Sequence, residues 1–243
     1  MVVGAGSHDQ RSAGSLRIQR QLLLHSDESE AMKSTERSLR AHVYDRLSEM
    51  IIAGDVRPGE PLREAKLAEM LGTSRVPVRE AIQRLTEEGW LERNPRSSAR
   101  VIVPSRDYIN EVFDLRLILE TAAIKLAVRR VSLEDIERLR AISADGDAAA
   151  HAGNISDAMR ANMRFHAEIA QLTANRLLAE TIKGLDRRVR WLYGFIEAER
   201  FTEHIEIIQA LEDRDVDRAM KATIRHLEHT RKDFLEHWPD PAG

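Results

Sequence analysis

The N-terminal third of the chain has apolar residues at helical spacing, interrupted by turns. One helix is predicted over about residues 39–52, and Gly54 ends it. Two further helices are predicted over about 64–71 and 75–88. The turn between them ends in Ser74, which is expected to cap the following helix by accepting a hydrogen bond from an exposed backbone N–H.

A β-hairpin is predicted directly after these three helices. Residues 90–93 and 100–103 have the character of two short strands, and the polar stretch 94–98 between them predicts a turn. Three helices and a hairpin make a winged helix-turn-helix, which we place at residues 38–104. The preceding residues 1–37 hold Gly, Ser and charges with little periodicity, and we expect most of them to be disordered.

Every periodic segment after the linker at Pro104-Ser105 is helical. Ser132 and Asp135 form the start of a capping box, which marks one helix N-terminus. The pattern therefore predicts a mostly α protein whose second domain, residues 105–238, is an all-α bundle. The helices of this bundle are predicted over residues 106–129, 132–150, 155–173, 177–198, 202–212 and 214–236.

Composition narrows the classes of protein that fit this pattern. The 243 residues include no cysteine, so the chain forms no disulfide and any metal site must use His, Asp, Glu or Asn. No run of about 18 apolar residues is present, so we expect no membrane span and a cytoplasmic location. The formal net charge is −3, so any contact with nucleic acid must come from a local basic patch.

The third helix of the winged domain carries such a patch. In this motif the second helix of the helix-turn-helix pair lies in the major groove, with its N-terminal residues nearest the base edges. Arginines four residues apart share a face there, and arginine suits bidentate contact with guanine or a clamp on phosphate. The alternative is a solvated face paired with the glutamates at positions 80, 87, 88 and 92. The predicted DNA contacts are Ser74, Arg75, Val76, Pro77, Arg79 and, on the wing, Arg96.

This stretch also resembles a known family. The sequence LAEMLGTSRVPVREAIQRL from Leu67 to Leu85, followed by Glu88-Gly89-Trp90-Leu91, is similar to the GntR superfamily of transcription regulators. Family members commonly carry a DNA-contacting Arg at the position of Ala65. The resemblance implies that Arg63 and Lys66 substitute for it. Many members also have Gly where this chain has Ser98, so the wing turn is expected to differ.

The helical half resembles the ligand-binding domain of the FCD branch of the same superfamily. The matching pieces are residues 113–120, 162–166, Glu203-His204 and His226-Leu227. Together with the winged domain, the resemblance covers about residues 38–236. It implies a regulator whose DNA affinity responds to a small-molecule effector.

Inward-facing histidines on three helices predict a metal site in this half. Asn162 and His166 are four residues apart and share one apolar face. His204 and His226 lie on the apolar faces of two later helices. Neutral imidazoles suit a divalent transition metal such as zinc, nickel or manganese (Zn, Ni or Mn). The family's first ligand is usually Asp, and Asn162 supplies a neutral oxygen in its place.

Arg116 lies on an otherwise apolar helix face and must find a partner. One interpretation is a structural ion pair with Glu120, four residues further on. The other, which the family resemblance implies, is that Arg116 binds the carboxylate of a small organic acid effector. A cavity is expected between Arg116 and the histidines. The pattern leaves the two interpretations open.

Three classes of function compete for these features. We expect a ligand-responsive DNA-binding regulator, because a reading head and an effector domain together explain the whole pattern. One recognition helix reads only a half-site, so a homodimer on a palindromic operator is expected. A metal-dependent enzyme of the helical bundle is the alternative, but no residue stands out as its general base. A protein-interaction module is the third possibility, and the arginine face argues against it.

Overall fold

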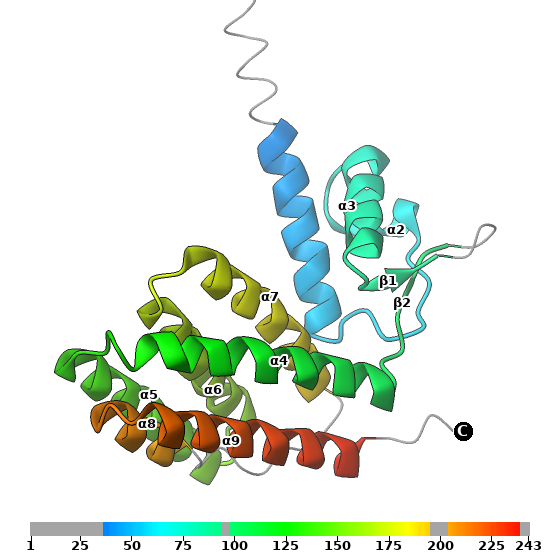
Figure 1. Cartoon of the computed structure of the whole chain (residues 1–243). Helices are drawn as coiled ribbons and strands as arrows, with labels where there is room; N and C mark the ends of the chain where they lie inside the picture. Colours follow the sequence, from blue (N-terminus) through cyan, green and yellow to red (C-terminus); the bar gives the residue numbers. More distant parts are fainter. Residues whose placement is uncertain (1–35, 94–97, 195–203, 239–243) are drawn as a thin grey trace, which may run out of the picture. The chain divides into compact units, whose positions relative to one another are not determined.

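A computed structural model of the protein describes residues 36–93, 98–194 and 204–238 (Figure 1). The fold is mostly α with one small β-hairpin, as predicted. The described part of the chain divides into two compact units. One consists of residues 36–49 and 60–101, and the other of residues 50–59 and 102–238. The tail predicted over residues 1–37 lies almost entirely outside the described residues.

The first unit contains the helices and hairpin of a winged helix-turn-helix. A first helix covers residues 36–52, of which 36–49 belong to this unit, and Gly54 follows the helix with a positive φ of 81°. The other elements are α2 (Glu64–Met70), α3 (Arg75–Glu87), β1 (Leu91–Glu92) and β2 (Arg100–Val101). The strands pair antiparallel and are shorter than predicted. The core of the unit includes the buried side chains of Leu47, Val78, Ile82, Leu85 and Trp90.

The segment before α2 adds a third strand-like edge to the hairpin. Pro61 forms an antiparallel bridge with Arg100, and the backbone N–H of Leu62 donates to the carbonyl oxygen of Ala99 at 2.7 Å. This pairing was not predicted from the sequence. A proline and a three-residue contact leave too little alternation to indicate a strand.

The N-terminus of α3 corrects one prediction. Ser74 lies at the N-cap position with extended backbone, but its side chain makes no capping hydrogen bond. The third helical residue is Pro77, which has no N–H to donate to a capping oxygen. Proline in the first turn removes one of the donors that a cap would otherwise satisfy. Ser74 therefore keeps its hydroxyl available at an exposed position.

The second unit is a bundle of six helices among its described residues. The helix predicted to reach residue 198 has its last helical residue at Tyr193, and residues 195–203 lie outside the described residues. Gly194 occupies its C-cap position. The helices are α4 (Arg106–Ala127), α5 (Leu133–His151), α6 (Ile155–Leu172), α7 (Arg176–Tyr193), α8 (His204–Glu212) and α9 (Val216–His237).

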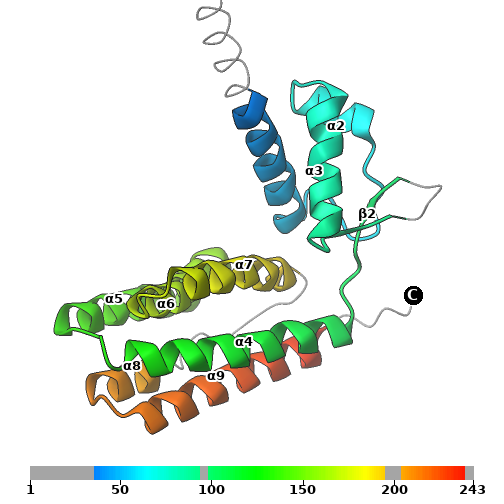
Figure 2. The same cartoon turned by 45° about the horizontal axis from the view of Figure 1, so that its top comes forward.

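Helix α4 is central to the packing of this bundle. It packs against α9, α6 and α7, and α4 and α9 lie side by side in both views (Figure 2). Helix α5 packs against α6 and α8, and these three helices surround the same core. The main apolar cluster joins residues of five helices, among them Ile124, Leu139, Phe165, Ile207 and Ala219. None of the described helices is long and apolar enough to span a bilayer.

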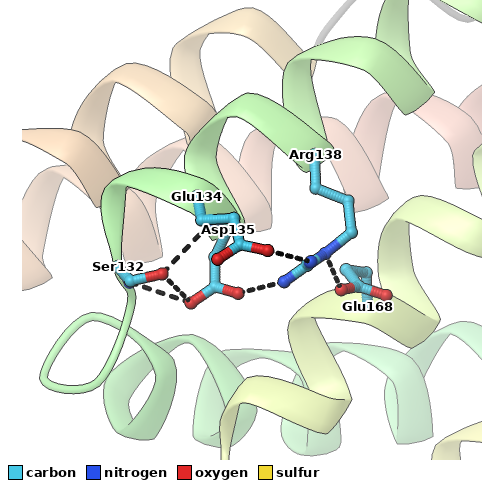
Figure 3. Close-up of polar contacts among 5 residues, drawn as sticks. All are labelled: Ser132, Glu134, Asp135, Arg138 and Glu168. Carbon is cyan, nitrogen blue, oxygen red and sulfur yellow. Dashed lines mark hydrogen bonds and ion pairs between the residues drawn. The ribbon is translucent and has the colours of Figure 1, made fainter.

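The predicted capping box fixes the start of α5 (Figure 3). The hydroxyl of Ser132 accepts from the backbone N–H of Asp135 at 3.2 Å, and the Asp135 carboxylate accepts from the backbone N–H of Ser132 at 2.9 Å. Arg138 extends from Asp135 to Glu168 of α6, with its Nε 2.6 Å from the Glu168 carboxylate. The box and this arginine tie the first turn of α5 to α6.

Candidate functional site

The first turn of α3 presents a polar and partly apolar surface. Arg75, Val76 and Arg79 are exposed, and Val76 leaves 57% of its surface accessible. Val78 and Ile82, on the opposite face, are buried. A helix that buries one face and exposes arginines with an apolar side chain can read base edges and thymine methyl groups in a major groove.

Glu64 of α2 holds Arg79 in place. The Arg79 Nη2 lies 2.9 Å from Glu64 Oε2, and its Nε donates to the same carboxylate at 3.2 Å. The hydrogen bond from Arg79 lowers the pKa of Glu64 below its ordinary value, with smaller contributions from Arg93 and Arg75. The ion pair that the sequence analysis gave as an alternative thus exists for Arg79, but with a different glutamate.

The other predicted DNA contacts differ in their exposure. Arg63 and Lys66 are exposed on α2 and its N-cap, beside the exposed Ala65. Pro77 is buried, so it can set the position of the α3 N-terminus but offers little surface to DNA. Arg96 lies in the segment 94–97, outside the described residues.

The structure brings the three predicted histidines together. One ring nitrogen each of His166, His204 and His226 lies within 4.8 Å of the others. The Nε2 atoms of His166 and His226 are 3.2 Å apart. This separation suits two nitrogens bound to one ion at about 2.0–2.1 Å. All three side chains are buried, and they come from α6, α8 and α9.

Two buried polar atoms, one in this cluster and one a helical turn from it, lack a partner among the described residues. Asn162 Oδ1 and His204 Nε2 are both buried without a hydrogen bond. A buried polar atom without a partner costs free energy, and such atoms are uncommon in folded proteins. Asn162 lies one turn before His166 on α6, and an amide oxygen and an imidazole nitrogen are both donors that a divalent metal accepts. The donor set therefore fits a transition metal ion.

A buried network leads from this cluster to Arg116. The Nε of Arg116 donates to Glu120 Oε1 at 2.7 Å, and Glu120 Oε2 lies 2.7 Å from His166 Nδ1. The carboxylate orients the imidazole so that its Nε2 faces the other histidines, as outer partners of metal-binding histidines do. Arg116 Nη1 is buried and has no partner in the described part of the chain. The ion pair with Glu120 thus exists and still leaves one guanidinium nitrogen unused.

The electrostatics of the cluster favour neutral histidine and ionised glutamate. Burial, followed by the neighbouring His226 and His166, holds the pKa of His204 well below its ordinary value. Burial alone would raise the pKa of Glu120, but Arg116 and His166 outweigh it and hold this pKa well below its ordinary value. A neutral imidazole keeps the lone pair that a metal needs.

A small cavity lies beside this network. It has a volume of about 10 Å³, and Glu120, His166 and Thr223 are among its lining residues. Arg116 does not line it. This is room for about one water-sized particle, so an organic acid fits only after side chains move apart.

Sequence reasoning missed two parts of this site. The bond from Glu120 to His166 joins two helices, and spacing along one helix cannot indicate it. Asp186 of α7 is buried near Arg116, at 5% exposure. Its helical spacing from the buried Ile182 and Val189 was the available signal.

Comparison with known proteins agrees with both units. Residues 39–101 match the family described as bacterial regulatory proteins of the gntR family, and residues 111–229 match the FCD domain. The Nta operon transcriptional regulator of Aminobacter aminovorans is 29% identical over 192 residues, which cover 77% of this chain and 90% of that protein. The HTH-type transcriptional regulator named RmpR, of Mycobacterium gastri, is 30% identical over 211 residues, with 76% of each chain covered.

Solved structures show the same architecture. The structure of E. coli McbR/YncC matches with a TM-score of 0.68 and 25% identity, over 82% of this chain and 97% of that chain. The family and these relatives are transcription regulators, a non-enzyme class, so the alternative of a metal-dependent enzyme finds no support. The chain belongs to the GntR family of bacterial transcription regulators and carries an FCD domain in its helical unit.

Proposed function

We propose that this regulator binds a palindromic operator as a homodimer and responds to a small organic acid through a metal site. We assign DNA reading to residues 38–104 and effector binding and dimerisation to residues 105–238. The observation that carries the DNA assignment is the exposed first turn of α3, where Arg75, Val76 and Arg79 lie opposite a buried apolar face. One such helix reads a half-site, so two copies related by a two-fold axis read a palindrome.

The ion pair of Arg79 refines this assignment. Glu64 pairs with the guanidinium of Arg79 and orients it, whereas Arg75 is exposed and is assigned a contact with the base edges. Ser74 has an exposed hydroxyl without a capping role and is assigned a phosphate contact, with Arg63 and Lys66 beside it. Arg96 of the wing is assigned a further contact with the duplex. Pro77 positions the turn.

DNA binding is tested with the full chain and duplexes selected from a random pool. The selected consensus is expected to be palindromic. Arg75→Ala is expected to weaken binding to that consensus by about 5- to 150-fold, since loss of a good base contact costs roughly 1–3 kcal/mol. Arg129→Ala removes an exposed arginine from the end of α4 and serves as the matched control. Wild-type affinity of Arg75→Ala, or an asymmetric site bound by a monomer, would overturn the assignment.

In the helical unit, Asn162, His166, His204 and His226 are assigned as ligands of a divalent transition metal, such as zinc, nickel or manganese. The unpartnered Asn162 Oδ1 and His204 Nε2 support this assignment. A bound ion supplies positive charge and open coordination positions for a carboxylate. Glu120 orients His166, and Arg116 offers its unpartnered Nη1 to the effector.

The size of the cavity bears on how the signal arises. An effector larger than water fits beside Glu120 and His166 only if the helices around them shift. Effector binding therefore favours a bundle conformation different from the one described here. A ligand changes DNA affinity by as much as its own affinity differs between the two conformations.

The effector assignment is tested by calorimetric titration of small hydroxy acids, sugar acids and dicarboxylates into zinc-loaded protein. Binding is expected to weaken at least tenfold in Arg116→Ala and in His204→Ala. Arg116→Lys keeps the charge beside Glu120 and separates a fold defect from a lost contact. If Arg116 only pairs with Glu120, Arg116→Ala will lower stability and leave effector affinity unchanged. Binding of neutral or long-chain apolar ligands alone, independent of metal, would overturn the organic acid assignment.

A further inference from the structure

A cleft between α5 and α8 has no role in the function proposed above. Its volume is about 300 Å³, within the range of small-molecule sites. None of the assigned metal ligands lines it, nor does Arg116. The wall formed by α5 is polar, and the wall formed by α8 is largely apolar.

The α5 wall contains two polar groups that have no hydrogen-bond partner among the residues the structure describes. Ser143 is 6% exposed, and its hydroxyl has no hydrogen-bond partner. Asp147 lies one turn further along the same helix face, and its Oδ1 is also buried without a partner. Two adjacent unsatisfied groups cost free energy. A ligand with N–H or O–H donors would satisfy both.

Among the described residues, the cations around the cleft compensate the charge of Asp147 only in part. Arg140 lines the cleft, but its guanidinium is engaged by Glu137 and Glu212. His151 is bonded through Nδ1 to the backbone oxygen of Asp147 and exerts only a weaker Coulombic effect on the carboxylate. Burial raises the pKa of Asp147 above its ordinary value. A positively charged ligand would reverse this penalty.

The α8 wall supplies apolar surface opposite these groups. Ile205 is 55% exposed and Ile208 is buried, and both line the cleft with Ala144 of α5. Gln209 completes the lining. We propose that the cleft binds a small organic ammonium compound, whose N–H groups donate to Asp147 and Ser143 and whose short hydrocarbon part packs on Ile205 and Ile208.

The probe for this site is n-butylamine, titrated into the full chain labelled at isoleucine methyl groups. The methyl signals of Ile205 and Ile208 are expected to shift with the amine. Neutral n-butanol and anionic butyrate, which match its length, are expected to bind at least tenfold more weakly. Equal binding of butyrate, or no shift at these two residues, would overturn the proposal.

Two variants test the site by different means. Asp147→Asn removes the charge at nearly constant volume and is expected to weaken amine binding at least tenfold. Ala144→Leu fills the cleft and keeps the carboxylate, so it tests the same site if Asp147→Asn folds poorly. Asp145→Asn, at an exposed position on the same helix, is the control and is expected to bind as the wild type does. Unchanged binding in Ala144→Leu and in folded Asp147→Asn would contradict the proposal.

A titration of chelator-treated protein distinguishes this site from the histidine cluster. Amine binding is expected to persist unchanged in metal-stripped protein, because no assigned metal ligand lines the cleft. Loss of amine binding on chelation would place the amine at the histidines and overturn the separate site. Failure of the metal assignment would leave the amine titration unaffected.

Discussion

At the scale of single residues, Asp186 gives the helical unit a pH-dependent stability. Burial, and then the nearby Glu120, raise its pKa from 3.8 to about 6, against the opposite effects of Arg116 and His166. The folded state therefore binds more protons than the unfolded state between about pH 4 and pH 6. The Asp186 carboxyl contributes its full stabilisation below the pKa that it has in the unfolded chain. This stabilisation is lost as the pH rises through the pKa that it has in the folded state.

The variant Asp186→Asn removes that dependence. The stability of the variant relative to wild type is expected to rise between pH 4 and pH 7, by at most about 3 kcal/mol for a shift of about two pKa units. Denaturant unfolding at a series of pH values in the presence of chelator measures the difference. Glu180→Gln, an exposed change on the same helix, is expected to give a flat difference. If the difference in unfolding free energy between Asp186→Asn and the wild type is also independent of pH, the carboxyl of Asp186 titrates normally.

The sequence predicted residues on shared helix faces better than contacts between helices. His166, His204 and His226 were grouped because each lies on an apolar stripe, and the structure brings them together. The bond from Glu120 to His166 depends on how α4 crosses α6, which no local spacing encodes. The cavity likewise depends on packing, so the sequence indicated a cavity near the histidines but neither its size nor which side chains line it.

At the scale of elements, the capping box of α5 makes a measurable contribution to stability. Ser132 satisfies a backbone donor at the start of the helix, and Asp135 returns the bond. Ser132→Ala is expected to lower the free energy of unfolding by about 1 kcal/mol, the usual cost of a lost cap. Chemical denaturation measures this cost. Ser156→Ala, at an exposed position inside α6, is the control, and an equal loss in both variants would rule out a specific capping effect.

Helices were predicted in their correct order because the apolar period and the turn residues agree. The strands were harder to predict, since each has two residues and the bridge at Pro61 has no alternating pattern around it. The predicted cap at Ser74 was wrong because the pattern was judged from the capping residue alone. The donor it needed is absent at Pro77.

At the scale of the whole molecule, metal removal is expected to lower thermal stability. A ligand that binds only the folded state stabilises it by about 2.7 kcal/mol at a free concentration of 100 times its dissociation constant. Melting curves with chelator and after addition of zinc, at verified metal content, measure the shift. His204→Ala is expected to abolish the response, whereas His151→Ala at the surface is expected to keep it. Equal melting curves for loaded and stripped wild type would remove the metal assignment.

The uncharged character of the assigned ligands has a consequence for what the regulator senses. Neither an amide nor an imidazole carries negative charge, and Arg116 and Glu120 already balance each other, so these four ligands offset none of the charge of a divalent ion. A carboxylate beside the ion cancels one of its two positive charges, whereas either one alone is buried at a greater cost. Because the two binding equilibria are linked, a bound metal raises the affinity of the site for the acid, and a bound acid raises its affinity for the metal by the same factor. On the proposed assignment the site is a coincidence detector, which reports the joint presence of a metal and an acid.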